Sequence, residues 1–193
     1  MAATIPTNGI VLNSGLDVAD GDITLANGHG VSFAATADAG DSDGRAEILN
    51  DYEEGSFSVT VGDATSGGNS NAMTHSGEVD GVYTKVGDTV FFSIAGTLNT
   101  TGLTGTNGIY LRGLPFTANN RTNFYELSTP RIAAGNAWNF SSGFTYICAT
   151  VPASATNINF YEQGDNVLGS GLKVNQVTDD TSVRVQGSYH TDS

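Results

Sequence analysis

Short apolar pairs separated by turn residues mark the first part of the chain. The two residues of a pair lie two positions apart, and successive pairs begin 6, 7 and 8 residues apart: Ile10 with Leu12, Leu16 with Val18, Ile23 with Leu25, and Val31 with Phe33. The Asn, Asp and Gly residues between the pairs readily form turns. The pattern therefore predicts strands of about three residues joined by turns.

Strands this short bury little apolar surface alone, so they need partners to be stable. The simplest partner is another copy of the same segment. We therefore expect residues 1–33 to form an intertwined stem in which three chains share a core. The expected core residues are Ile10, Leu12, Ile23, Leu25, Val31 and Phe33. The alternative is an N-terminal arm without fixed structure.

Residues 34–46 have no aromatic or large aliphatic side chain and cannot form a core. We predict an acidic linker rich in Gly, Ala and Asp. Asp38, Asp41 and Asp43 are faintly similar to a calcium loop, but their spacing does not match the twelve-residue loop and its final Glu is missing. We expect a solvated turn there and no metal site.

From Ile48 onward, longer alternating runs separated by Gly, Asn and Asp predict an all-β chain with almost no helix. We expect a jelly-roll-like β-sandwich head over residues 47–193. The predicted strands are 57–61, 82–86, 89–97, 109–114, 124–132, 144–151, 158–162, 172–174 and 182–189. Gly87 and Asp88 between two runs are a hairpin signal. Residues 62–77 show no periodicity and predict a long exposed loop.

Composition limits the partners. The formal charge is −13 with only 7 Lys plus Arg, so there is no basic face for nucleic acid or an anionic membrane. No stretch reaches the roughly 18 apolar residues of a membrane helix, and the N-terminus lacks the regions of a signal peptide. We expect neither membrane insertion nor export by the general secretory route.

Candidate thiol and imidazole sites are few. Cys148 is the single Cys and lies in an apolar run, so we expect a buried strand residue and no disulfide. His29, His75 and His190 are far apart and have no companion at a metal-ligand spacing. We predict no metal and no cofactor.

Asp51, Glu53 and Glu54 form the densest cluster of carboxylates. A glycan-cleaving enzyme needs two carboxyl groups at a fixed separation across a cleft. Neighbouring carboxylates between a linker and a strand more simply form a solvated shoulder that pairs with Lys85 or with an Arg of another subunit. We predict no catalytic residue.

Residues 135–143 form the one loop that is rich in both aromatic and Asn residues, and they contain the only Trp. Flat aromatic faces beside amide donors suit the CH faces and hydroxyls of sugars. Trp138, Asn136 and Asn139 are therefore the candidate glycan contacts. The alternative is that Trp138 fills one end of the sandwich core or the trimer interface.

Four segments follow one another in an order typical of one family. They are Ile48-Leu49-Asn50-Asp51-Tyr52-Glu53-Glu54-Gly55-Ser56-Phe57, residues 81–90 with Tyr83-Thr84-Lys85-Val86-Gly87-Asp88, Gly113-Leu114-Pro115-Phe116, and the closing Gly187-Ser188-Tyr189. Together they resemble the head domain of tail-fibre-like and head-fibre-like virion proteins of tailed bacteriophages, notably marine ones. Residues 21–33 also resemble what precedes this head in longer fibres. The long shaft is missing, which leaves tail and capsid mounting open.

The resemblance implies a non-enzymatic, homotrimeric fibre or spike at the virion surface. Such a protein is made in the host bacterial cytoplasm and contacts other virion proteins. We expect that contact at the N-terminus, because the first 12 residues carry no charged side chain. The head is expected to bind a host cell-surface glycan or protein. A capsid decoration or head-fibre protein with a mainly structural role is the alternative, and a polysaccharide depolymerase is the third possibility.

Overall fold

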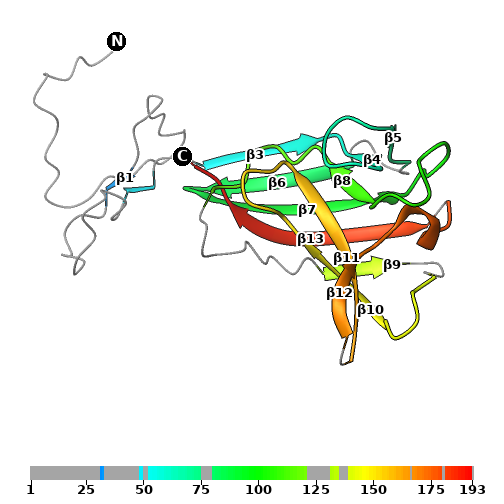
Figure 1. Cartoon of the computed structure of the whole chain (residues 1–193). Coiled ribbons are helices and arrows are strands. Elements are labelled where there is room, and N and C mark those ends of the chain that lie inside the picture. The colour runs from blue at the N-terminus through cyan, green and yellow to red at the C-terminus, as the bar shows by residue number, and fades with distance from the viewer. Residues whose placement is uncertain are drawn as a thin grey trace, which may run out of the picture.

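The computed structural model describes residues 31–32, 48–49, 52–74, 80–120, 131–134, 139–165, 167–179 and 181–192. Over these residues the chain is all-β, with two large antiparallel sheets and one short 3₁₀ turn, η1 (Val174–Gln176) (Figure 1). The prediction of an all-β fold with almost no helix is confirmed for this part of the chain.

A separate short pair is formed by β1 (Val31–Ser32) and β2 (Ile48–Leu49), in which Val31 is antiparallel to Leu49 of the same chain. These strands flank residues 34–46. The other expected stem core residues lie outside the described residues: Ile10, Leu12, Ile23, Leu25 and Phe33. The intertwined stem thus stays a prediction.

The five-stranded sheet has the order β3–β6–β7–β13–β9. Its strands are β3 (Tyr52–Phe57), β6 (Gly81–Val86), β7 (Thr89–Thr97), β13 (Ser182–His190) and β9 (Arg131–Ala134). The last strand of the chain therefore lies inside the sheet, hydrogen-bonded to β7 along its whole length.

The six-stranded sheet has the order β10–β11–β8–β4–β5, and β12 also pairs with β11. Its strands are β4 (Thr60–Gly62), β5 (Ser70–Ala72), β8 (Tyr110–Arg112), β10 (Tyr146–Thr150), β11 (Asn157–Gly164) and β12 (Val167–Gly171).

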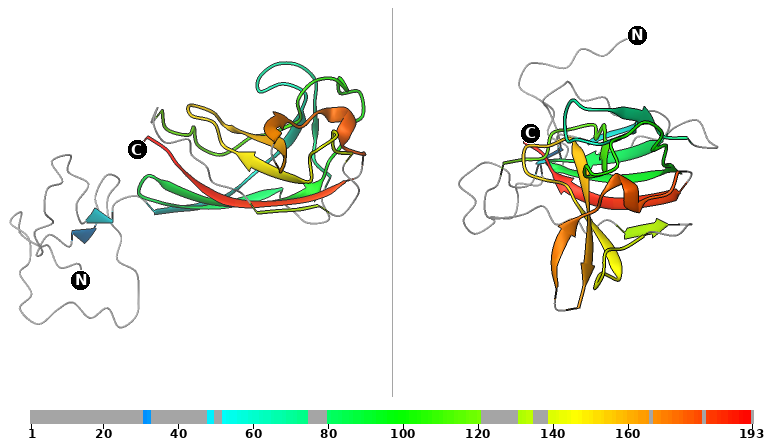
Figure 2. Two further views of the ribbon diagram at one scale, coloured as in Figure 1. Left: turned by 60° about the horizontal axis from the view of Figure 1, so that its bottom comes forward. Right: turned by 45° about the vertical axis from the view of Figure 1, so that its right-hand side comes forward.

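The two sheets lie face to face, as in a β-sandwich (Figure 2). Their facing side chains form one core. Alternation along the strands selects these residues, because successive side chains of a strand point to opposite faces. The five-stranded sheet contributes Val90, Phe92, Ile94, Val183, Val185 and Tyr189, and the six-stranded sheet contributes Val61, Leu111, Ala149, Ile158 and Phe160. The apolar periodicity that predicted a sandwich is thus the periodicity of its core.

Three predicted elements differ from the structure. The strand expected at 57–61 is split, because β3 ends at Phe57 and the chain crosses to the other sheet before β4. The predicted loop 62–77 contains β5, a polar strand held by pairing with β4. The strand predicted at 172–174 is wrong, because β12 ends earlier and the backbone turns into η1, where the Gln176 side chain accepts a hydrogen bond from the Lys173 N–H at 2.8 Å.

The hairpin predicted at Gly87 and Asp88 is confirmed. Val86 pairs with Thr89 across a two-residue turn. Gly87 has a φ of +59° whereas Asp88 does not have a positive φ, as in a type II′ turn with Gly first.

The strand ends separate into two groups. We call the end with the start of β3, the Gly87–Asp88 turn and the end of β13 the proximal end; there Tyr52 pairs with Val86, and His190 pairs with Thr89. The opposite, distal end begins where Thr97 pairs with Ser182, and it holds the loops 63–69, 98–109 and 172–181 (Figure 1). The described chain therefore enters and leaves the sandwich at the same end.

Candidate functional site

A carboxylate joins two of the distal loops. Asp63 is 3 % exposed and accepts hydrogen bonds from the backbone N–H of Thr104 at 2.9 Å and from the backbone and side chain of Asn69 at 2.8 and 2.9 Å. The bond from Thr104, followed by those from Asn69, lowers the pKa of Asp63 to about 2. The carboxylate is thus charged at neutral pH and fixes loop 63–69 against loop 98–109.

Further hydrogen bonds fix the other distal segments. Asp179 accepts from the backbone N–H of Thr100 at 2.7 Å and from the Thr101 hydroxyl at 3.2 Å. The side-chain amide of Asn71 donates to the carbonyls of Asn99 and Thr101, both at 2.9 Å. The distal end is therefore organised by its own polar groups before any ligand binds.

A pocket of about 250 Å³ opens in this end of the molecule. It lies between the segment that leads to β10 and η1, and it is lined by Asn139, Phe140, Ser141, Lys173, Asn175 and Gln176. The backbone joins its two walls, because the Asn139 N–H donates to the Gln176 carbonyl at 2.8 Å.

A buried carboxylate supports the pocket from β11. Glu162 is 2 % exposed and accepts hydrogen bonds from the Gln176 side-chain amide at 2.6 Å and from the Ser141 N–H at 2.9 Å. Burial raises the pKa of Glu162, but the bonds from Ser141 and Gln176 and the charge of Lys173 outweigh it and lower the pKa. An ionised Glu162 therefore holds both walls in place.

Three polar side chains are left to face the pocket. Asn139, Lys173 and Asn175 are exposed, and within the described part of the chain their side chains make no hydrogen bond. An amide both donates and accepts hydrogen bonds, and an ammonium donates three. Held on fixed walls beside the partly exposed ring of Phe140, these groups suit a hydroxyl-rich ligand.

No family model matches the chain, and a comparison of its sequence with curated proteins found no match.

The structure places one of the three predicted glycan contacts in this pocket. Asn139 lies there, whereas Asn136 and Trp138 lie outside the described residues. The described residues on either side of that segment are at the distal end, since Ala134 pairs with Val183 and Asn139 bonds to η1.

Sequence analysis missed Lys173, Asn175 and Glu162. The only signal for Lys173 and Asn175 was a cation followed by two amides, Lys173-Val174-Asn175-Gln176, in an acidic chain, and Glu162 had no signal of its own.

The predicted carboxylate shoulder is divided between the two faces of β3. Glu53 lies opposite Lys85, which is 4 % exposed, whereas Glu54 accepts a hydrogen bond from the Tyr52 hydroxyl at 2.5 Å. Asp51 lies outside the described residues.

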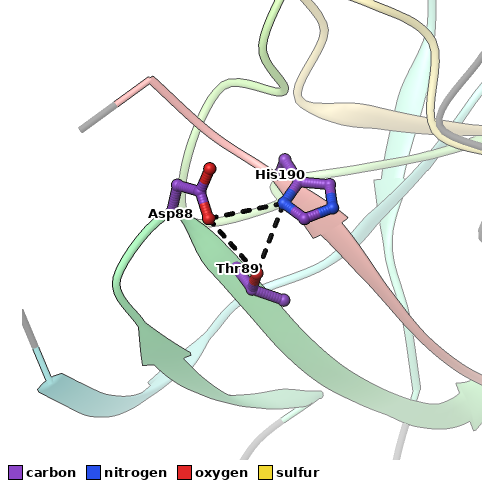
Figure 3. A network of polar contacts seen from close by, with 3 residues as sticks. All are labelled: Asp88, Thr89 and His190. Atoms are coloured by element: carbon purple, nitrogen blue, oxygen red, sulfur yellow. Dashed lines mark hydrogen bonds and ion pairs between the residues drawn. The ribbon is translucent and has the colours of Figure 1, made fainter. Parts of the chain in front are cut away.

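The one described His belongs to a small proximal network. His190 Nδ1 lies 3.5 Å from Asp88 Oδ1 and 3.3 Å from the Thr89 hydroxyl (Figure 3). His29 and His75 lie outside the described residues. Among the residues that the structure describes, no group of three or more His, Cys, Asp or Glu could hold a metal ion.

Cys148 is in β10 as predicted, but it is half-buried, because its neighbour Ala149 points into the core. Burial raises the pKa of the Cys148 thiol.

In the described part of the chain, no helix has the length and apolar character that a membrane span requires.

Proposed function

We propose that this chain is a non-enzymatic subunit of a bacteriophage particle, whose homotrimeric, jelly-roll-like head binds a host-surface glycan through the distal pocket. The observation that carries the proposal is the fixed pocket with three exposed polar side chains, Asn139, Lys173 and Asn175, which make no side-chain hydrogen bond to any residue that the structure describes. A binding site for sugars needs such groups held in place, because ordering loose side chains on binding costs affinity.

The separation of the proximal and distal ends supports a binding site at the free end of the head. Residues 1–51 precede β3 and therefore join the head at the proximal end. If these residues form the stem and contact other virion proteins, the pocket lies at the end of the head farthest from that attachment. Recognition by loops at the free end of a rigid β scaffold is a common arrangement.

The pocket volume indicates the size of the ligand. A volume of about 250 Å³ is below the roughly 300 to 1,000 Å³ of pockets for drug-sized ligands. The pocket therefore accommodates one sugar unit at a time, and each head binds weakly. Many heads on one particle still attach firmly, because linked binding events raise the overall affinity.

Competition with intact particles tests the proposal. Purified protein should inhibit adsorption of the phage to its host, and Asn175→Ala should lose most of this inhibition because an amide that contacts the sugar is removed. Asn120→Ala is the matched control, since Asn120 is an exposed Asn at the proximal end, next to the bridge between Ala118 and Thr191.

The same experiment separates the alternatives. Particles that lack the protein and still adsorb normally would contradict adhesion and favour a capsid decoration or head-fibre role. Release of sugars from host polysaccharide by the purified protein would favour a depolymerase and contradict the non-enzymatic assignment.

A further inference from the structure

Large apolar side chains are exposed together on the outer face of the five-stranded sheet. Tyr52 is 57 % exposed, Phe91 52 %, Val82 47 % and Val86 38 %. Four of the six exposed large apolar side chains of the described residues thus lie on one face, and such a concentration is a sign of a contact surface.

The strand register shows that these four residues form one patch. Val86 lies opposite Tyr52 on β3, and Phe91 of β7 lies opposite Thr84, which stands between Val82 and Val86 on β6. A shallow groove of about 440 Å³ runs over the same three strands, lined among others by Glu54, Val82, Thr84 and Phe91.

Most of the residues around the patch are neutral and polar. The outward positions of β3, β6, β7 and β13 around it include Ser56, Thr84, Thr89, Ser93, Gln186 and Ser188. They contain one carboxylate, Glu54, and one guanidinium, Arg184, although the chain has 20 Asp plus Glu. Asp88 and His190 lie beside Thr89 at the proximal edge of the face. An apolar centre with a polar rim in which charges are sparse is the usual anatomy of a protein–protein interface.

The charge of this face identifies its partner. A basic protein would gain from an acidic face, and nucleic acid would need a basic one. A second copy of this chain carries the same −13 charge and can approach closely only where the carboxylates are sparse. The patch also begins at Tyr52, where residues 1–51 join the head, so chains held together by a shared stem would present it to one another.

We infer that the patch of Tyr52, Val82, Val86 and Phe91 is the contact between heads of neighbouring copies. This inference rests on the proposed homotrimer and assigns its interface to one face of one sheet. The pocket at the distal end remains open in such an assembly, because it is lined by residues 139–141, Lys173 and η1, none of which belongs to the five-stranded sheet.

Sedimentation equilibrium and hydroxyl-radical footprinting of the full-length protein test the inference. The wild type should sediment as a trimer with Tyr52 and Phe91 protected from modification. Leu168, a 94 % exposed apolar residue on β12, is the internal reference and should be modified freely. Phe91→Asp should raise the dissociation constant at least tenfold and expose Tyr52, whereas Leu168→Asp should change neither.

A milder variant guards against a folding defect. The double substitution Val82→Thr and Val86→Thr keeps β-branched side chains in β6 and should also weaken association.

A trimer in which Tyr52 and Phe91 react as freely as Leu168 would overturn the assigned face and leave the trimer intact. A monomer at all micromolar concentrations would contradict the proposed trimer itself. Protection that persists in dilute monomer would show that the chain's own N-terminal segment covers the face, which also overturns the inference.

Discussion

Buried carboxylates organise the distal end of the head. Asp63 and Glu162 are both less than 4 % exposed, and each accepts hydrogen bonds from segments distant in sequence. A buried carboxylate is stable only when its charge is hydrogen-bonded or paired. These two residues therefore join loops that apolar packing alone would not hold.

Acid should weaken the distal loops through Asp63. The pKa of Asp63 is lowered to about 2 in the folded protein from an ordinary value of 3.8. A lowered pKa means that the carboxylate stabilises the fold above about pH 4 and that this contribution is lost as the pH falls toward 2. Melting temperatures from pH 5 to pH 2 should fall more steeply for the wild type than for Asp63→Asn. If the melting temperature falls equally with pH in both proteins, ionisation of Asp63 does not stabilise the distal loops.

At the scale of elements, apolar periodicity predicted the strands that fill the core. The strands β6, β7 and β13 were expected nearly at their observed bounds, because alternating residues such as Val90 and Val185 reveal which face is buried. The strand β5 was missed because its residues, Ser70–Ala72, are polar or small and are strand only through pairing with β4. Pairing between distant segments leaves no local pattern in a sequence.

Most of the pocket could not be predicted either, because it also depends on contacts between distant segments. Asn139 was expected from its aromatic and amide-rich neighbourhood, which is local. Lys173 and Asn175 join it only because β12 ends early and η1 turns beside residues 139–141. That turn depends on a hydrogen bond from Lys173 to the Gln176 side chain, which periodicity does not encode.

Two glycines of the resembling segments should differ in their tolerance of Ala. Gly113 has a φ of +109°, and an added Cβ would lie 2.3 Å from the Ser58 carbonyl oxygen, where the chain crosses between the sheets. Gly87 has a φ of +59° with nothing within 4 Å. Gly87→Ala should cost about 1 to 2 kcal/mol of unfolding free energy, and Gly113→Ala should cost more because strain and a backbone clash add. Urea unfolding measures both, and equal losses would contradict this account of the crossing.

At the scale of the whole molecule, the head has a complete core of its own. Every core residue that the structure describes lies between Val59 and Tyr189, and these residues already form one continuous cluster. We therefore predict that a fragment of residues 47–193 folds without the N-terminal segment. It should give a β-type far-ultraviolet spectrum and a cooperative melt. An unfolded spectrum would show that the head depends on the preceding residues for folding.

The arrangement of the molecule has one functional consequence. The chain enters and leaves the sandwich at the proximal end, the apolar patch starts beside that point, and the polar pocket lies at the distal end. The surface proposed for assembly and the pocket proposed for recognition are thus separate, as an adhesive head would require.

An NMR titration of the purified protein with fragments of the host surface glycan tests the central claim most directly. The side-chain amide signals of Asn139 and Asn175 report from the pocket, and the signal of Asn120 at the proximal end serves as reference. We expect saturable shifts of the two pocket signals and no shift of the Asn120 signal. If the sugar is acidic, Lys173→Gln should abolish binding. Shifts confined to other surfaces, or no shift at millimolar glycan from a host that the particle infects, would contradict the claim that the distal pocket binds the host glycan.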